Sequence, residues 1–399
     1  MRCDILVIGG GAAGMCAAIT AKRISGASVI LTERGERVGR KLAATGNGRC
    51  NITNRDITAE RYHGGDVEPV LANVTPDDTQ RFFESLGIVY FCGDDGKVYP
   101  YSLQASSVVD ALRYECERLG VEVMCECEVT EINRHTAITA SGRIEFKRAI
   151  IACGGEASRS LGGSSLGYKL LGGVGHSVTR RGAAIVPIRT KTDKIRALKG
   201  IKTDAVVTAE SQFGRRTEQG EVLFTDYGLS GPPILQVSRL FDGVGGTVTL
   251  DLMPQYSFSE VCDMIRARKS SVYLDRCEFL FVGMLNKRVG QAVVKAAGIS
   301  LADSARALDE RRIKLIAAAI KSFSLVCTGN CGTEHAQVTT GGVPLSEFDT
   351  ATMRSTVAPS IYACGEVLDV DGDCGGFNLQ WAWSSGILAG RSAAMELKK

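Results

Sequence analysis

The 399-residue sequence has no C-x-x-C motif, although it contains 14 cysteines, and it has only four histidines. The closest cysteine pair, Cys125 and Cys127, is separated by one residue, and Cys327 and Cys331 are four positions apart. Zinc and iron–sulfur sites in proteins usually show characteristic close spacings of thiolate or imidazole ligands. We therefore expect no metal site, and reduced, mostly buried thiols.

Long apolar runs and a charge excess are also missing. No stretch approaches the roughly 18 uninterrupted apolar residues of a membrane-spanning helix. Asp4 and three consecutive glycines disfavour a signal peptide in the apolar N-terminal segment. The 47 basic and 44 acidic residues nearly balance, which predicts no large basic surface. We expect a cytoplasmic protein with a small-molecule substrate and no membrane or nucleic-acid partner, and we leave its oligomeric state open.

The N-terminal segment is typical of a dinucleotide-binding unit. An apolar run is followed by G-x-G-x-x-G at residues 9–14, an alanine-rich helical segment and a second apolar run that ends in Glu33. In this motif Gly9 makes the tight turn, Gly11 admits the pyrophosphate, and Gly14 allows the helix to pack on the strand. The helix N-terminus attracts the phosphates, and Glu33 is spaced to bind a ribose hydroxyl. The sequence therefore predicts an ADP-containing cofactor.

Later segments predict that this domain is interrupted. Alternating residues from Val121 to Val129 predict one strand, and the apolar run 149–152 enters another glycine turn. Short strand-like stretches follow, then a helical pattern from about 257 to 321, and a strand and helix at the C-terminus. We expect three domains, with these bounds: 1–182 and 346–399 for the cofactor, 183–257 and 321–345 for a β-rich substrate domain, and 258–320 for a small helical domain.

Two further segments contain residue types that suit contacts with a cofactor. The loop 39–51, GRKLAATGNGRCN, combines glycines with arginine and asparagine, which suit a second phosphate and ring contact. The segment 364–378 places Glu366 after a strand, where it could hold a ribityl hydroxyl. It also places a glycine pair before the last helix, whose positive end could lie beneath a flavin carbonyl. A calcium loop is disfavoured because Cys374 replaces the glycine that D-x-D-x-D-G requires.

These motifs resemble the bacterial YhiN/BaiN-type, or aminoacetone-oxidase-family, FAD-binding enzymes. The match includes residues 39–51, VLFTDYGLSG at 222–231, VTTGG at 338–342 and the segment 364–386. The resemblance implies FAD and a Rossmann-like α/β domain of the two-dinucleotide-binding-domain type, interrupted by a β-rich substrate domain that carries a small helical insertion. The family's usual glycine triplet is Gly46-Asn47-Gly48 here.

The expected cofactor contacts come from both ends of the chain. They are Gly9, Gly11, Ala12, Ala13, Gly14, Glu33, Arg34, Gly39, Arg40, Lys41, Thr45, Gly46, Asn47, Gly48, Arg49, Asn51, Val129, Gly154, Gly155, Gly365, Glu366, Asp373, Gly376, Phe377 and Asn378.

The sequence lacks residues that several other classes of flavoprotein require, and this limits the possible reactions. A dithiol reductase needs two cysteines after the second strand, where only Cys50 occurs. Alcohol-type oxidases use a catalytic histidine near the C-terminus, and no histidine follows His335. A second nucleotide-binding unit is missing, so a nicotinamide would visit the flavin transiently. We favour an NAD(P)H-driven reductase of a C=C bond conjugated to a ketone, with hydride transfer at flavin N5. The alternatives are an amine oxidase and a non-catalytic flavin redox sensor.

The proton donor or substrate anchor is the least determined part of the site. The candidates are Tyr227, Tyr99, Arg49 and Tyr101, and Tyr227 is favoured because it lies in the family-matching stretch before Gly228. The substrate and the preferred nicotinamide stay open.

Overall fold

A computed structural model describes residues 1–270 and 275–398, which divide into two compact units. Unit 1 holds residues 1–182 and the chain from 337 onward, and unit 2 holds residues 183–336. Residues 337–345 cluster with unit 1, where the Val343 N–H donates to the Val367 carbonyl oxygen. Within the described ranges, no helix is long and apolar enough to cross a membrane.

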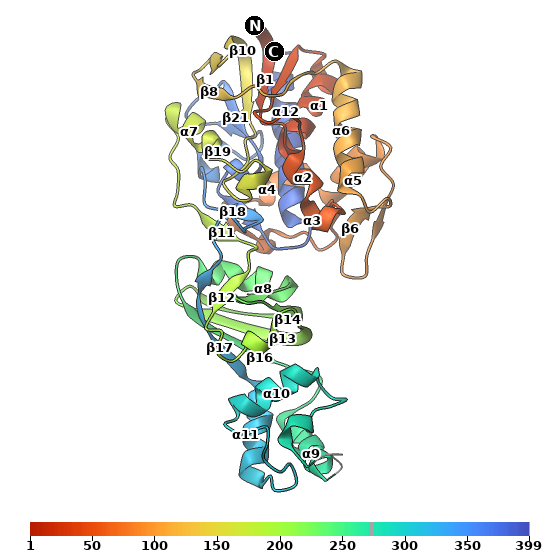
Figure 1. The fold of residues 1–399 in the computed structure, drawn as a ribbon. Coiled ribbons are helices and arrows are strands. Elements are labelled where there is room, and N and C mark those ends of the chain that lie inside the picture. The colour runs from red at the N-terminus through yellow and green to blue at the C-terminus, as the bar shows by residue number, and fades with distance from the viewer. Residues whose placement is uncertain (271–274, 399) are drawn as a thin grey trace. The chain divides into compact units, whose positions relative to one another are not determined.

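Unit 1 is built on a nine-stranded sheet whose central strands are parallel (Figure 1). Its main path runs in the order β19 (Phe348–Asp349), β20 (Arg354–Ser355), β21 (Ile361–Ala363), β10 (Gly142–Ile151), β1 (Arg2–Ile8), β2 (Val29–Thr32) and β7 (Glu122–Met124). β8 (Val129–Ile132) and β9 (Thr136–Thr139) pair beside β10. The parallel strands β1, β2 and β21, and the last three residues of β10, bury nearly all their side chains, because helices cover the sheet. This arrangement confirms the expected α/β fold.

Two helices pack together on this sheet, α1 (Ala12–Ser25) and α12 (Phe377–Glu396), the red and blue helices of Figure 1. Glycines on α12 permit the approach. A Cβ on Gly386 would lie 2.4 Å from the Ala13 carbonyl oxygen, and one on Gly390 would lie 2.3 Å from the Ala17 carbonyl oxygen. The last helix therefore braces the first, whose N-terminus follows the glycine turn.

The remaining elements of unit 1 surround this core. The helices are α2 (Arg40–Ala43), α3 (Thr45–Gly48), α4 (Glu68–Asn73), α5 (Pro76–Glu84), α6 (Ala105–Leu119) and α7 (Leu166–Gly173). The strands are β3 (Thr53–Asn54), β4 (Tyr62–Gly64), β5 (Tyr90–Cys92), β6 (Lys97–Pro100), β18 (Val338–Thr340) and β22 (Val370–Gly372). The short strand β11 (Gly182–Ala184) includes the point in the chain where unit 1 ends and unit 2 begins.

The expectation of one strand from Val121 to Val129 is wrong. The chain leaves β7 and turns at Glu126, which has a φ of +53°, before β8 begins. The Glu126 and Cys127 N–H groups donate to the carbonyl oxygens of Gly35 and Glu33, so the turn passes over the end of β2. Tertiary hydrogen bonds override the alternating pattern, and Cys125 is exposed.

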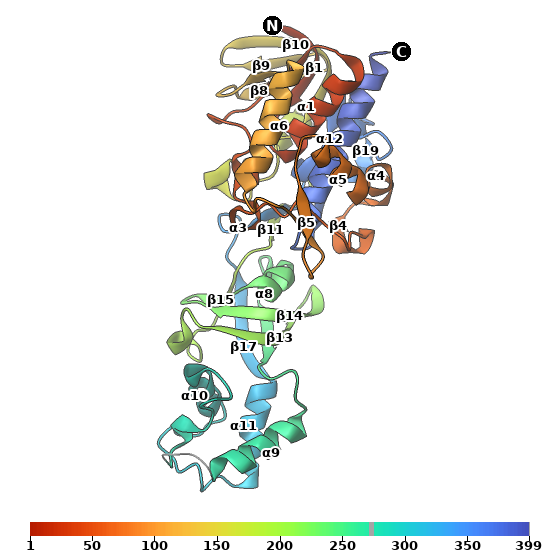
Figure 2. The same ribbon diagram turned by 90° about the vertical axis from the view of Figure 1, so that its right-hand side faces the viewer.

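Unit 2 contains a closed barrel and three longer helices (Figure 2). The barrel order is β12 (Ile188–Thr190), β15 (Gly228–Ser230), β14 (Gly214–Phe224), β13 (Lys202–Ser211), β16 (Gly246–Asp251) and β17 (Phe323–Asn330). The helices are α8 (Pro232–Val237), α9 (Phe258–Lys269), α10 (Lys287–Ala296) and α11 (Glu310–Lys321), of which the last three gather beyond one end of the barrel. The barrel and these helices share one hydrophobic core.

Candidate functional site

The turn between β1 and α1 shows why each motif glycine is present. Gly9 has a φ of +111°, and a Cβ there would lie 2.4 Å from the Ala152 carbonyl oxygen. A Cβ on Gly14 would lie 1.9 Å from the Gly9 carbonyl oxygen. Gly11 differs, because its φ is −82° and an added Cβ would meet nothing within 4 Å. The protein's own packing does not require glycine at position 11, which leaves open space at a helix N-terminus, where an anion is stabilised.

The Glu33 carboxylate is fixed beside this turn. One oxygen accepts the Gly10 N–H at 2.9 Å and the other accepts the Gly35 N–H at 2.8 Å. Each oxygen keeps a further lone pair, since an ionised carboxylate has about four acceptor positions. Glu33 is therefore oriented by backbone groups and can still accept hydroxyl donors such as those of a ribose.

Arginines extend the site beyond Glu33. The Arg34 guanidinium donates to the Gly162 carbonyl oxygen and that of Arg40 to the Ser160 carbonyl oxygen, each at 2.9 Å. A cavity of about 430 Å³ lies here, lined by Arg34, Gly35, Glu36, Arg37, Arg40 and Glu126. The predicted residues Arg34 and Arg40 therefore hold the 158–163 loop beside a polar hollow next to Glu33.

An ion pair joins the two predicted cofactor loops. Lys41 Nζ lies 2.6 Å from Glu366 Oε2, and the other Glu366 oxygen accepts the Thr339 N–H at 2.8 Å. A Cβ on Gly155 would lie 2.8 Å from Glu366 Oε1. Residues separated by more than 300 positions in the sequence thus meet at one carboxylate.

The loop 39–51 adopts unusual backbone conformations. Gly46 and Asn47 both lie in the left-handed region, with φ values of 59° and 55°. Asparagine is one of the few residues other than glycine that tolerates this region. Asn47 therefore adopts a left-handed conformation that glycine would also allow. Thr45 holds the loop, because its hydroxyl donates to the Leu42 carbonyl oxygen at 2.7 Å. Gly39 has a φ of +74° and Gly48 one of +81°.

Asn51 carries an unused polar atom. The residue is buried, and its Oδ1 has no hydrogen-bond partner among the described residues. A Cβ on Gly376, the residue before α12, would lie 3.1 Å from this oxygen. A buried, unpartnered side-chain amide oxygen is costly unless a ligand completes its hydrogen bonds. Asn51 and the N-terminus of α12 therefore form a place suited to a planar ring with polar edges, such as isoalloxazine.

Other predicted side chains next to α12 are engaged by the protein itself. Asp373 pairs with Arg61 at 3.2 Å, and the Asn378 amide donates to the Gly372 carbonyl oxygen at 2.7 Å. Phe377 is buried and packs edge-on against Tyr62. These side chains shape the turn before α12.

The remaining predicted residues lie at the start of α1, after β10 and at the start of β8. Ala12 and Ala13 begin α1, and a Cβ on Gly365 would lie 3.0 Å from Ala13 Cβ. Gly154 has a φ of +70° and open space around it, as Gly11 does. Val129 is buried at the start of β8.

Sequence reasoning missed a buried polar network that anchors the site. The Gln380 amide accepts from the Thr53 hydroxyl at 2.6 Å and donates to Thr79 and Ser384, each at 2.8 Å. On the same helix, the Trp381 indole N–H donates to the Gly365 carbonyl oxygen. These residues attach the loop after 51 and the turn at 365 to α12. In the sequence, these residues are indicated only by polar side chains within an otherwise apolar C-terminal helical segment.

The candidate proton donors divide between the units. Tyr99 belongs to unit 1, and its Cε1 lies 3.6 Å from where a Cβ on Gly46 would be. Burial raises the Tyr99 pKa, so its hydroxyl stays protonated at neutral pH. Arg49 is exposed on the same loop. Tyr101 is exposed, and Tyr227 belongs to unit 2 between β14 and β15.

The cysteines show no redox pair. All 14 are free thiols, and Cys50, which lies in the loop 39–51, is fully buried. Burial raises the pKa of its thiol to about 12, which keeps it protonated and unreactive. No group of three or more candidate metal ligands occurs in residues 1–270 and 275–398.

The strand, glycine turn, helix and acid are the parts of a dinucleotide-binding protein of the doubly wound class, and the open space at Gly11 and the unpartnered Asn51 oxygen suit such a cofactor. The chain is an FAD-dependent oxidoreductase. It belongs to the HI0933-like protein Rossmann domain family, whose model matches residues 3–392.

Curated relatives match almost the whole chain. A Clostridium scindens protein named 3-dehydro-bile acid delta(4,6)-reductase is 36% identical, with 97% of this chain and 98% of that protein aligned. A Haemophilus influenzae protein named ribosomal RNA dihydrouridine synthase is 31% identical over 95% of this chain and 96% of that protein. An Escherichia coli protein of the same name is 30% identical, with 96% of each aligned.

Solved structures share the fold. A flavocytochrome c3 fumarate reductase in its open conformation gives a TM-score of 0.51 at 17% identity, covering 100% of this chain and 79% of that one. The 3-ketosteroid delta1-dehydrogenase of Sterolibacterium denitrificans gives 0.51 at 12% identity, covering 99% and 100%. At these identities the likeness concerns the fold.

Proposed function

We propose that the chain is a cytoplasmic, NAD(P)H-driven reductase that uses FAD to saturate a C=C bond conjugated to a carbonyl. The observation that carries this proposal is the 36% identical relative that spans nearly the whole chain and is named a delta(4,6)-reductase of a 3-dehydro bile acid. In a 3-oxo steroid the delta-4 double bond is conjugated to the C3 ketone, so its reduction belongs to this class.

Each part of an FAD molecule can be assigned to residues of unit 1. We assign the pyrophosphate to Gly11 and the N-terminus of α1, the adenosine ribose to Glu33, and the ribityl chain to the Lys41–Glu366 pair. Asn51 and the N-terminus of α12 would hold the polar edge of the ring. When bound, FAD supplies a hydride acceptor and donor at N5.

A proton must also reach the substrate carbon next to the carbonyl. Tyr99 suits this role best, because it lies in unit 1 against the loop 39–51 and its hydroxyl is protonated at neutral pH. Tyr227 and Arg49 remain the other candidates. We assign the β-rich barrel of unit 2 to substrate binding.

The test is anaerobic. The FAD-loaded protein is mixed with NADH or NADPH and then with a 3-oxo-delta-4 steroid, while flavin absorbance is followed. We expect the nicotinamide to bleach the flavin and the enone to restore the colour without oxygen. If a primary amine bleaches the flavin and neither nicotinamide does, the amine oxidase alternative replaces this proposal. If no donor reduces the flavin, the redox-sensor alternative gains support.

A second candidate substrate is uridine in ribosomal RNA. Dihydrouridine is uridine reduced at C5=C6, a bond conjugated to the C4 carbonyl, so the reaction class is the same as above. Two relatives carry the name ribosomal RNA dihydrouridine synthase. Unit 2 also has an exposed basic stretch at 189–202, in which Arg189, Lys191 and Arg196 form no ion pair within the described residues. Such cations would bind phosphates.

The prediction of no nucleic-acid partner therefore needs its own test. Uridine-containing ribosomal RNA is added as the acceptor in the anaerobic assay, with the enone as the parallel arm. Reoxidation by RNA and not by the enone would assign the uridine substrate, and dihydrouridine would appear in the digested RNA by mass spectrometry.

A further inference from the structure

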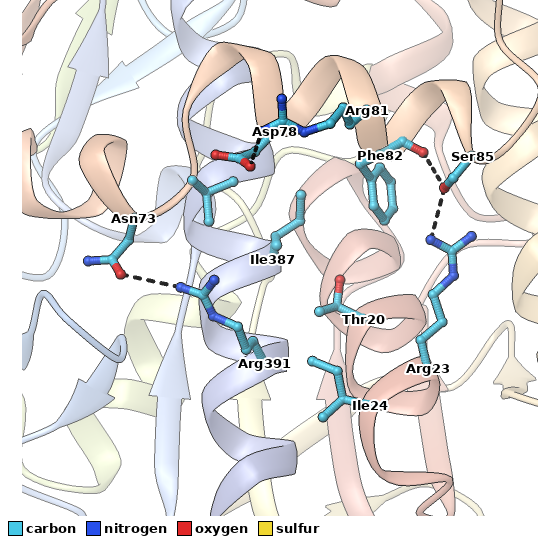
Figure 3. Close-up of a pocket in the computed structure, with 11 residues that line it drawn as sticks. Thr20, Arg23, Ile24, Asn73, Asp78, Arg81, Phe82, Ser85, Ile387 and Arg391 are labelled. Carbon is cyan, nitrogen blue, oxygen red and sulfur yellow. Dashed lines mark hydrogen bonds and ion pairs between the residues drawn. The ribbon is translucent and has the colours of Figure 1, made fainter.

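A cavity of about 360 Å³ lies in unit 1 between α1, α5 and α12 (Figure 3). It is separate from the cofactor cradle. Thr20, one of its lining residues, lies nine residues beyond Gly11 on α1, which is about 13 Å along the helix at 1.5 Å per residue. Arg391 lies further along α12 than the site at its N-terminus. No role described so far uses this cavity.

One part of the cavity wall is apolar. Ile24 comes from α1, Phe82 from α5 and Ile387 from α12, and all three side chains border the same space in Figure 3. They are only partly buried by the protein. A ligand with a hydrocarbon body would cover them and gain about 25 cal/mol for each Å² of apolar surface removed from water.

The Thr20 hydroxyl lies unpaired within this wall. Thr20 is 8% exposed, and its Oγ1 has no hydrogen-bond partner among the described residues. Figure 3 shows this oxygen pointing toward the space between Ile387 and Phe82. A buried hydroxyl without a partner is costly, so this position favours an occupant that supplies one.

The arginines of the cavity differ in how their charges are balanced. Arg23 pairs with Glu115 at 2.7 Å, and Arg81 pairs with Asp78 at 2.7 Å. Arg391 has no carboxylate partner within the described residues, and its guanidinium donates only to the neutral Asn73 amide oxygen, at 3.3 Å. Of the arginines that line the cavity, Arg391 is therefore the one that has no carboxylate partner among the described residues.

We propose that this cavity, the Arg391 pocket, binds a small organic anion with an apolar body. The carboxylate or phosphate head of the anion lies at Arg391, where it replaces the long Asn73 contact by a charge-assisted hydrogen bond. The body lies against Ile387, Ile24 and Phe82, and a polar atom of the ligand pairs with the Thr20 hydroxyl. A volume of about 360 Å³ falls at the lower end of small-molecule sites.

Calorimetric titration of the full-length, FAD-loaded protein tests the proposal. Octanoate and octyl phosphate are the probes, while octanol lacks the charge and inorganic phosphate lacks the apolar body. We expect at least one of the amphiphilic anions to bind about tenfold more tightly than octanol and inorganic phosphate, since both halves of the ligand contribute. The better probe identifies the headgroup. Absence of binding by both amphiphilic anions overturns the proposal.

Two variants locate the binding. Arg391→Met should weaken the better probe about tenfold or more, and Thr20→Val, which keeps the side-chain shape, should weaken it several-fold. Arg113→Met is the control, because Arg113 is an exposed helical arginine of unit 1 that lies on α6 and does not line the cavity. Equal affinity in the wild type and in Arg391→Met, or equal loss in Arg113→Met, would place the anion elsewhere and overturn the assignment.

Discussion

Replacing Gly11 by valine tests the cofactor site with little risk to the fold. Its φ of −82° is ordinary for valine, and the added Cβ meets no protein atom within 4 Å. The side chain would instead fill the open space at the N-terminus of α1. Two charge-assisted backbone hydrogen bonds to the pyrophosphate, at about 1.5–3 kcal/mol each, would be lost. FAD binding should weaken by about 3–6 kcal/mol, or roughly a hundred- to ten-thousandfold.

The assay compares flavin content with folding. Gly11→Val should elute from gel filtration as a colourless protein with the circular dichroism spectrum of wild-type apoprotein and a similar Tm. Gly14→Ala is the contrasting variant, because its Cβ would lie 1.9 Å from the Gly9 carbonyl oxygen and should lower the Tm. A folded Gly11→Val protein that retains full flavin would refute the assignment of the pyrophosphate to this turn.

Much of the cofactor domain could be predicted from local sequence. The apolar run before Gly9 is β1, the alanine-rich segment is α1, and the C-terminal helix expected from about Phe377 to Leu397 is α12, Phe377–Glu396. These elements are predictable because their periodicity and their glycine boundaries agree. The place of Glu33 directly after β2 is also predictable from spacing, since the βαβ unit fixes the distance from the glycines to the end of the second strand, while its ribose contact stays a prediction.

Long-range contacts could not be predicted. The strand expected across residues 121–129 breaks because backbone groups at the end of β2 bind the chain at Glu126, which no local pattern encodes. The Lys41–Glu366 pair and the Gln380 network likewise join segments hundreds of residues apart. An alternating apolar pattern predicts which side chains of a single strand are buried. It does not predict these contacts, because they depend on which loops the folded sheet brings together.

Three further predictions concern side chains of unit 1. Glu33→Ala should weaken FAD binding by about 1–3 kcal/mol, measured by flavin fluorescence on dilution, because it removes one charged acceptor; unchanged affinity would contradict the ribose assignment. Cys50→Ser should keep turnover within several-fold, and native Cys50 should resist alkylation at neutral pH, since burial holds its thiol pKa at about 12; a mixed disulfide at Cys50 would oppose this. Tyr99→Phe should lower the rate of flavin reoxidation by the enone about a hundredfold, within the usual range for a general acid, and leave flavin reduction by the nicotinamide intact. Because burial raises the Tyr99 pKa, its acid form persists as pH increases, so the wild-type reoxidation rate should stay level through neutral pH and fall only under alkaline conditions, beyond the usual range for a tyrosine. Equal slowing of both half-reactions in Tyr99→Phe would indicate a structural role and exclude it as the proton donor.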